Sequence, residues 1–93
     1  MPVRVRLPAI LRDLPGARGT IELSGAFDTL SDALDALWRE APSVRDRVLT
    51  ETGEVREHVQ LFVGNESIRF TGGLATAVPE GTEIHIVPAV SGG

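Results

Sequence analysis

Two short runs near the start of the chain alternate apolar and polar residues, with the period of two that is typical of a strand with one buried face. In residues 3–7 arginines separate the apolar side chains, and Pro8 then removes a backbone donor and ends the run. Residues 20–24 repeat the alternation. We predict an antiparallel hairpin with a long connection, under which Ile10 and Leu11 are expected to pack.

The next segment has the three-and-four spacing of an amphipathic helix. Thr29 stands at the N-cap position and Asp32 at the third helical position, a variant of the capping box that also suits the helix dipole. Pro42 is expected to end the helix, and Ser43 to cap a short second helical turn. The apolar stripe that should pack on a sheet consists of Leu30, Ala33, Leu34, Leu37, Trp38 and Ala41.

Strand patterns return in the second half of the chain. Residues 58–63 alternate in the same way, Gly64-Asn65 is a tight-turn pair, and residues 67–70 are predicted to form a short return strand. Residues 82–87 are predicted to form the last strand. The remaining segments, interpreted as connections, are residues 50–57 and 71–81.

The order of these elements predicts a single α+β domain over residues 1–93. One main helix between two groups of strands favours a mixed sheet of about five strands, with the first and last strands adjacent and parallel at its centre. A tail over residues 88–93 would leave the last strand directly and is expected to be flexible.

The same alternation predicts an exposed apolar patch on the sheet face away from the helix. Side chains that alternate with the inward-facing residues must point outward, and some of them are large and apolar. A cluster of this kind beside the tail is what a transient partner site requires. The candidate docking residues are Phe62 and Val87, with Phe70 or Leu74 completing the patch and Arg4 and Arg6 flanking it.

Composition narrows the classes of function. A chain of 93 residues allows one small domain, and its net charge of −4 argues against a duplex nucleic-acid binder, which needs a basic surface. With no cysteine, the chain has no disulfide, thiolate catalysis or Cys-ligated zinc. No apolar run approaches a membrane span and the start lacks a signal-peptide core, so we expect a cytoplasmic protein without membrane partners.

Other candidate chemistry in the chain is weak. His58 and His85 stand alone without ligand partners at useful spacing, so we expect no metal site. The pair Gly72-Gly73 lacks the lysine and hydroxyl residue of a phosphate loop. Since no catalytic triad can be argued from scattered serines, histidines and aspartates, we do not expect an enzyme.

The two glycines at the end of the sequence are the clearest candidate for chemistry. An arm without side chains can pass through a channel too narrow for any Cβ atom, and it would carry a free carboxylate. The residues predicted to thread into a partner are Val90, Ser91, Gly92 and Gly93. All nine basic residues are arginine, so an activated carboxylate could not be attacked by a lysine of another copy.

The element order and the terminal Gly-Gly resemble the ubiquitin-like β-grasp fold. Residues 63–66, 69–76 and 86–93 resemble the bacterial sulfur-carrier proteins, a family that includes the small subunit of molybdopterin synthase. The similarity is greater still to the carriers that supply sulfur for cysteine synthesis in actinobacteria. That family commonly ends in Ala-Gly-Gly, whereas this chain has Ser91 in place of the alanine.

This resemblance implies a protein co-substrate that binds no cofactor itself and is monomeric when free. An E1-like enzyme would use ATP to adenylate the Gly93 carboxylate, sulfur would displace AMP, and the thiocarboxylate would donate sulfide to a sulfur-accepting synthase. Two other readings remain open: a modifier conjugated through Gly93 to lysines of other proteins, and an interaction domain whose glycines are incidental. The sequence does not identify the acceptor, which could be a precursor of cysteine, molybdopterin, thiamin thiazole or a secondary metabolite.

Overall fold

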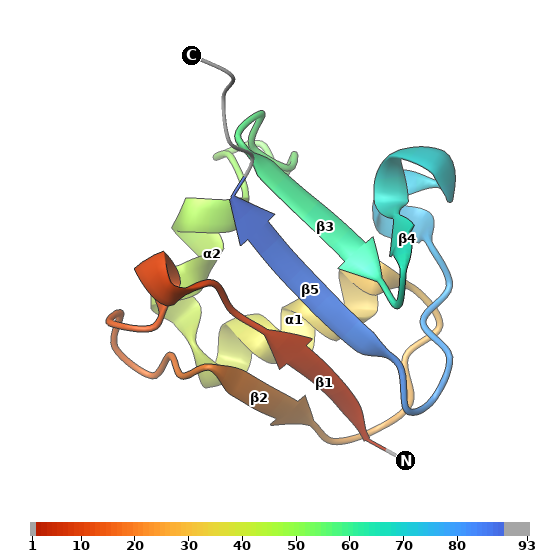
Figure 1. The fold of residues 1–93 in the computed structure, drawn as a ribbon, viewed down its shortest axis with the longest axis horizontal. Coiled ribbons are helices and arrows are strands. Elements are labelled where there is room, and N and C mark those ends of the chain that lie inside the picture. The colour runs from red at the N-terminus through yellow and green to blue at the C-terminus, as the bar shows by residue number, and fades with distance from the viewer. Residues whose placement is uncertain (1, 89–93) are drawn as a thin grey trace.

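The fold, taken from a computed structural model of the chain, is described for residues 2–88 (Figure 1). Five strands form one sheet, two α-helices cover one of its faces, and three single 3₁₀ turns lie in the connections. The strands are β1 (Val3–Arg6), β2 (Thr20–Leu23), β3 (Val59–Val63), β4 (Glu66–Ser67) and β5 (Glu83–Pro88). The helices are α1 (Leu30–Glu40) and α2 (Pro42–Val48), and the turns are η1 (Ala9–Leu11), η2 (Ile68–Phe70) and η3 (Gly73–Ala75).

The strand order in the sheet is β2-β1-β5-β3-β4. β1 pairs in parallel with β5, whereas the β1–β2, β5–β3 and β3–β4 pairs are antiparallel. The predicted mixed sheet, with the first and last strands adjacent at its centre, is therefore confirmed. Because a parallel pair needs a crossover connection, every element from β2 to β4 lies within the crossover between β1 and β5.

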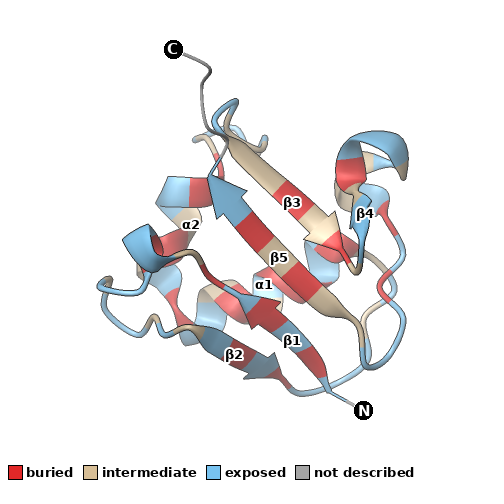
Figure 2. Ribbon diagram, viewed as in Figure 1, coloured by how far each residue is buried: buried red, intermediate tan, exposed pale blue. Residues whose placement is uncertain are grey.

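The core lies between the sheet and the helices. Burial alternates strictly along β1 and β2 and over the first five residues of β5, so one face of the sheet is buried (Figure 2). The predicted stripe of α1 faces this core: Leu30, Ala33, Leu34, Leu37 and Ala41 are buried, and Trp38 lies at its edge. The Thr29 side chain accepts a hydrogen bond of 3.2 Å from the Asp32 backbone N–H. The predicted N-cap is thus confirmed.

Two local predictions are wrong in part: the packing of the turn between β1 and β2, and the start of the helix that follows α1. Leu11 is buried as expected, but Ile10 is 74% exposed, because consecutive side chains of a 3₁₀ turn point in different directions. Pro42 does end α1, yet it also occupies the first turn of α2, where its missing N–H costs nothing. Ser43 therefore caps no helix, and its hydroxyl instead donates to the Pro15 carbonyl at 2.8 Å.

The predicted return strand over residues 67–70 is also shorter than expected. β4 ends at Ser67, whose hydroxyl accepts a 3.4 Å hydrogen bond from the Arg69 backbone N–H and so turns the chain into η2. Next, Gly72 and Gly73 adopt positive φ angles of 114° and 63°, which other residues avoid. These glycines therefore serve a backbone turn. In the connection over residues 50–57, Val55 packs against the core.

Within residues 2–88, none of the helices combines the length and the apolar character needed to cross a bilayer.

We predict that the two faces of β3 differ sharply in their contribution to stability. Leu61 is 1% exposed, so Leu61→Ala should lower the free energy of unfolding by about 2–5 kcal/mol through loss of packing and a cavity. Phe62 points to the other face, and Phe62→Ala should cost about 1 kcal/mol or less. Urea unfolding followed by the fluorescence of Trp38 measures both changes. If the two losses were equal, the side-chain alternation along β3 would be wrong.

Candidate functional site

The candidate site begins where the central strand ends. β5 is paired on one side with β1 and on the other with β3, and its last residue, Pro88, lies opposite Val59. Residues 89–93 follow in the sequence, and the predicted threading residues Val90, Ser91, Gly92 and Gly93 lie outside the described residues. The structure therefore shows the base of the arm, which is the end of β5: its last three residues pair with β3, and the pairing with β1 ends at His85.

The face of the sheet away from the helices carries several of the predicted docking residues. The register places Arg6 beside His85 and His85 beside Phe62, so that one row crosses β1, β5 and β3. Val87 lies opposite Gln60, which makes Phe62 and Val87 diagonal neighbours, about 7–8 Å apart. Phe62 and Val87 therefore share this face, as predicted, with His85 next to Phe62.

Arg4 and Arg6 also lie on this face, but each already has an acidic neighbour within the chain. Arg4 Nε is 3.2 Å from Glu22 Oε1, and Arg6 Nη1 is 3.8 Å from Glu83 Oε1. Glu83 Oε1 also lies 3.7 Å from His85 Nε2. Exposed pairs of this kind add little stability. Both arginines can therefore exchange their partners for acidic groups of another protein at low cost.

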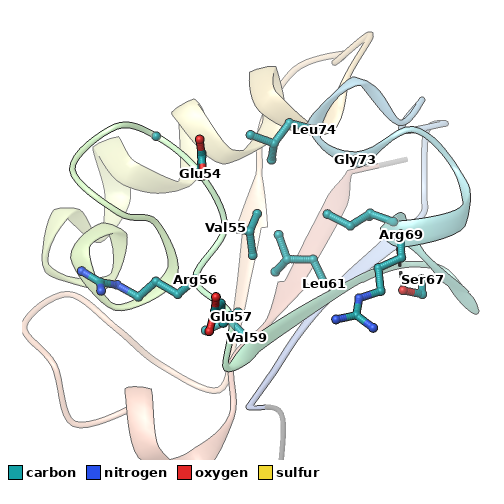
Figure 3. A pocket seen from close by; sticks show the side chains of 12 residues that line it. Glu54, Val55, Arg56, Glu57, Val59, Leu61, Ser67, Arg69, Gly73 and Leu74 are labelled. Carbon is teal, nitrogen blue, oxygen red and sulfur yellow. Dashed lines mark hydrogen bonds between the residues drawn. The ribbon is translucent and has the colours of Figure 1, made fainter.

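Leu74 does not complete this patch, and that part of the prediction is wrong. Phe70 is 87% exposed in η2, which follows the edge strand β4, and its place in the docking patch stays a prediction. Leu74 lies in η3 on the helix side of the sheet, where Figure 3 shows its side chain toward Val55 and Leu61. The cause is the early end of β4, which turns the chain away from the open face.

Leu74 instead borders a groove of about 530 Å³ on the helix side of β3 (Figure 3). Its apolar walls come from Val55, Val59, Leu61, Ile68 and Leu74. Charged side chains of both signs line it as well, two glutamates and two arginines: Glu54, Glu57, Arg56 and Arg69. The sequence analysis did not find this groove; Val55 within an otherwise polar segment was the available signal.

A second, smaller hollow of about 120 Å³ lies at the base of the tail. We call it the tail-end hollow; its lining includes Pro8, Ile10, His58, Val59, Ile86 and Pro88. The exposed Ile10 was missed because an apolar residue in a loop was expected to pack inward. His58 and His85 belong to no group of three or more potential metal ligands within residues 2–88.

Comparisons with known proteins give consistent matches over the whole chain. The model of the ThiS family matches residues 5–93. The sulfur carrier protein CysO of Mycobacterium tuberculosis is 36% identical over 95 residues, with both chains covered in full. Among solved structures, the BexX/CysO complex of Amycolatopsis orientalis contains a chain that aligns with a TM-score of 0.84 at 31% identity, covering 98% of this chain and 99% of that one. SAMP1 from Haloferax volcanii aligns with a TM-score of 0.80 at 32% identity, with full coverage of both chains.

Proposed function

This chain belongs to the ThiS family, and from that premise we propose that it is a sulfur carrier whose Gly93 carboxylate is converted to a thiocarboxylate. The predicted family and the ubiquitin-like β-grasp fold are both confirmed by the family match and the structural neighbours. Its relatives are small carrier or modifier proteins and not catalysts. The chain would accordingly serve as a protein co-substrate of partner enzymes.

The chemistry would proceed in three steps, all of which involve the carboxyl group of Gly93. In the first step, an oxygen of the Gly93 carboxylate attacks the α-phosphorus of ATP in an E1-like enzyme, and pyrophosphate leaves. Sulfide delivered by the enzyme then attacks the acyl carbon, AMP leaves with the original oxygen, and a thiocarboxylate remains. In the last step the thiocarboxylate sulfur attacks an electrophilic carbon of the acceptor held by a sulfur-accepting synthase and displaces its leaving group, and water then cleaves the resulting thioester, which restores the Gly93 carboxylate. The ATP belongs to the activating enzyme, and the carrier itself would bind no cofactor.

The observation that carries this proposal is the position of β5. The strand that leads to Gly93 lies in the centre of the sheet, and only residues 89–93 separate its end from the terminal carboxylate. β5 pairs with β1 up to His85 and with β3 up to Pro88. The arm that follows it can therefore be inserted into an enzyme without unfolding of the domain. Since Gly92 and Gly93 have no side chains, a narrow channel can enclose them.

The open face of the sheet is the surface that we propose for recognition by the E1-like enzyme. Phe62 and Val87 would supply apolar contact area, while Arg4 and Arg6 would exchange their present carboxylate neighbours for acidic groups of the enzyme. Such a site suits transient binding, because the carrier must leave one enzyme to reach the next. We place this exchange in the cytoplasm, with a monomeric carrier and without nucleic acid or membrane.

Two acceptor classes are candidates, and one alternative function is favoured by a particular relative. CysO matches support the sulfur-carrier function, with a cysteine precursor as the first candidate acceptor, and the BexX/CysO complex supports a carrier that binds a partner protein directly. Transfer to a molybdopterin precursor is the second candidate. The small archaeal modifier protein 1 of Haloferax volcanii, 34% identical over 89 residues, favours conjugation through Gly93 as the alternative.

The first test of this proposal is the replacement of Gly92. Gly92→Val should abolish ATP–pyrophosphate exchange by the activating enzyme, because a branched side chain would block the channel. Gly92 lies outside the described residues and is not among the residues of the core, so the melting temperature should match that of the unaltered protein. Gly92→Ala, which adds one methyl group, is the graded control and should retain more exchange. Undiminished exchange with Gly92→Val would contradict the narrow-channel argument.

A second test concerns Phe62. Phe62→Ala should weaken binding to the E1-like enzyme by about 1–3 kcal/mol, as loss of an interface anchor does. Phe62→Leu keeps most of the apolar contact area and is the graded control, which should bind more tightly than Phe62→Ala. Isothermal titration of both variants and of the unaltered protein measures the differences. If Phe62→Ala bound as tightly as the unaltered protein, the open face would not be the recognition surface.

A further inference from the structure

Ile10 is an exposed apolar side chain that its backbone holds in a fixed place. It is 74% exposed, although its neighbour Leu11 is buried. The turn around it is closed by hydrogen bonds from the Leu11 N–H to the Pro8 carbonyl at 3.0 Å and from the Arg12 N–H to the Ala9 carbonyl at 3.2 Å. Single exposed apolar residues are ordinary. Ile10 is of interest because of what lies beside it.

The parallel pairing of β1 with β5 brings Ile10 to the base of the tail. Parallel strands end at the same edge of a sheet, so η1, which follows β1, and the end of β5 both lie at that edge (Figure 1). Ile10 and Pro88 both line the tail-end hollow, so the two residues lie close together. Its volume of about 120 Å³ approaches the cavity of about 150 Å³ that accepts a benzene-sized group. One apolar side chain of another protein can therefore fill it.

The short length of the arm identifies the protein that must cover this surface. Five residues span at most about 17 Å when fully extended, so the atoms that react with Gly93 must lie within that distance of Pro88. An enzyme that encloses the two glycines has only residues 89–91 between its channel and the folded domain. Its channel rim must therefore meet the edge of the sheet where Ile10 and Pro88 lie.

We propose that Ile10 and the tail-end hollow form a docking site for the enzyme that activates Gly93, with an apolar side chain of its channel rim in the hollow. This inference rests on the proposed function. Arg47 also lines the hollow, and its guanidinium makes no ion pair with any residue in the described range. An acidic group of the enzyme, next to the apolar side chain of its channel rim, would pair with Arg47.

The test is carrier-dependent ATP–pyrophosphate exchange with the purified E1-like enzyme of the organism that supplies the chain. Ile10→Ala should lower kcat/KM for the carrier about 10-fold and Ile10→Asp about 100-fold, mainly through KM, because the contact forms on binding. Ile10→Leu keeps the apolar volume and should stay within about threefold of the unaltered protein.

The outcomes separate this inference from the proposed function. If the unaltered carrier supports exchange and Ile10→Asp supports it equally well, the docking site is overturned while the carrier function stands. If the unaltered carrier supports no exchange, the proposed function fails and this inference fails with it. Melting temperatures establish that each variant is folded, and Ile10→Ala, which only shortens an exposed side chain, decides the matter if Ile10→Asp does not fold.

Discussion

The parallel hydrogen-bonded pairing of β1 with β5 is the constraint on which the rest of this structure depends. It places the first half of the last strand between two neighbours, while the end of that strand, at the base of the C-terminal arm, stays paired with β3. It also requires a crossover, and the helices that form part of this crossover cover one face of the sheet and leave the other open. The position of the arm, the open face and the tail-end hollow all follow from this one pairing.

The two faces of the sheet have different roles: one stabilises the fold, and the other is available for recognition by partners. On the helix side, Val5, Ile21 and Ile84 are fully buried and supply the hydrophobic energy of folding. On the open side, Phe62, Val87 and the arginines contribute little to the fold and remain available for contact. A carrier that passes between enzymes gains from this separation, because recognition residues can differ among relatives without loss of the core.

The sequence was informative where one side-chain period continued for several residues. Alternation in β1, β2, β3 and β5 and the stripe of α1 predicted the strands, the buried face and the sheet order. The prediction from the sequence was wrong where local hydrogen bonds determine the course of the backbone. The Ser67 hydroxyl ends β4 after two residues, and the 3₁₀ turn at Ile10 directs that side chain outward. Neither effect has a period, so Leu74 was assigned to the wrong face of the sheet and Ile10 was expected to be buried.

The central claim, that Gly93 carries sulfur, can be measured directly by intact-mass spectrometry of the protein purified from the organism that makes it. The account predicts a second form of the chain, heavier by the replacement of one oxygen by one sulfur, with the change located at Gly93 by fragmentation. The heavier form should accumulate when the sulfur-accepting reaction is blocked. A chain that keeps its unmodified mass under that block, or that is found joined through Gly93 to lysines of other proteins, would contradict the carrier function.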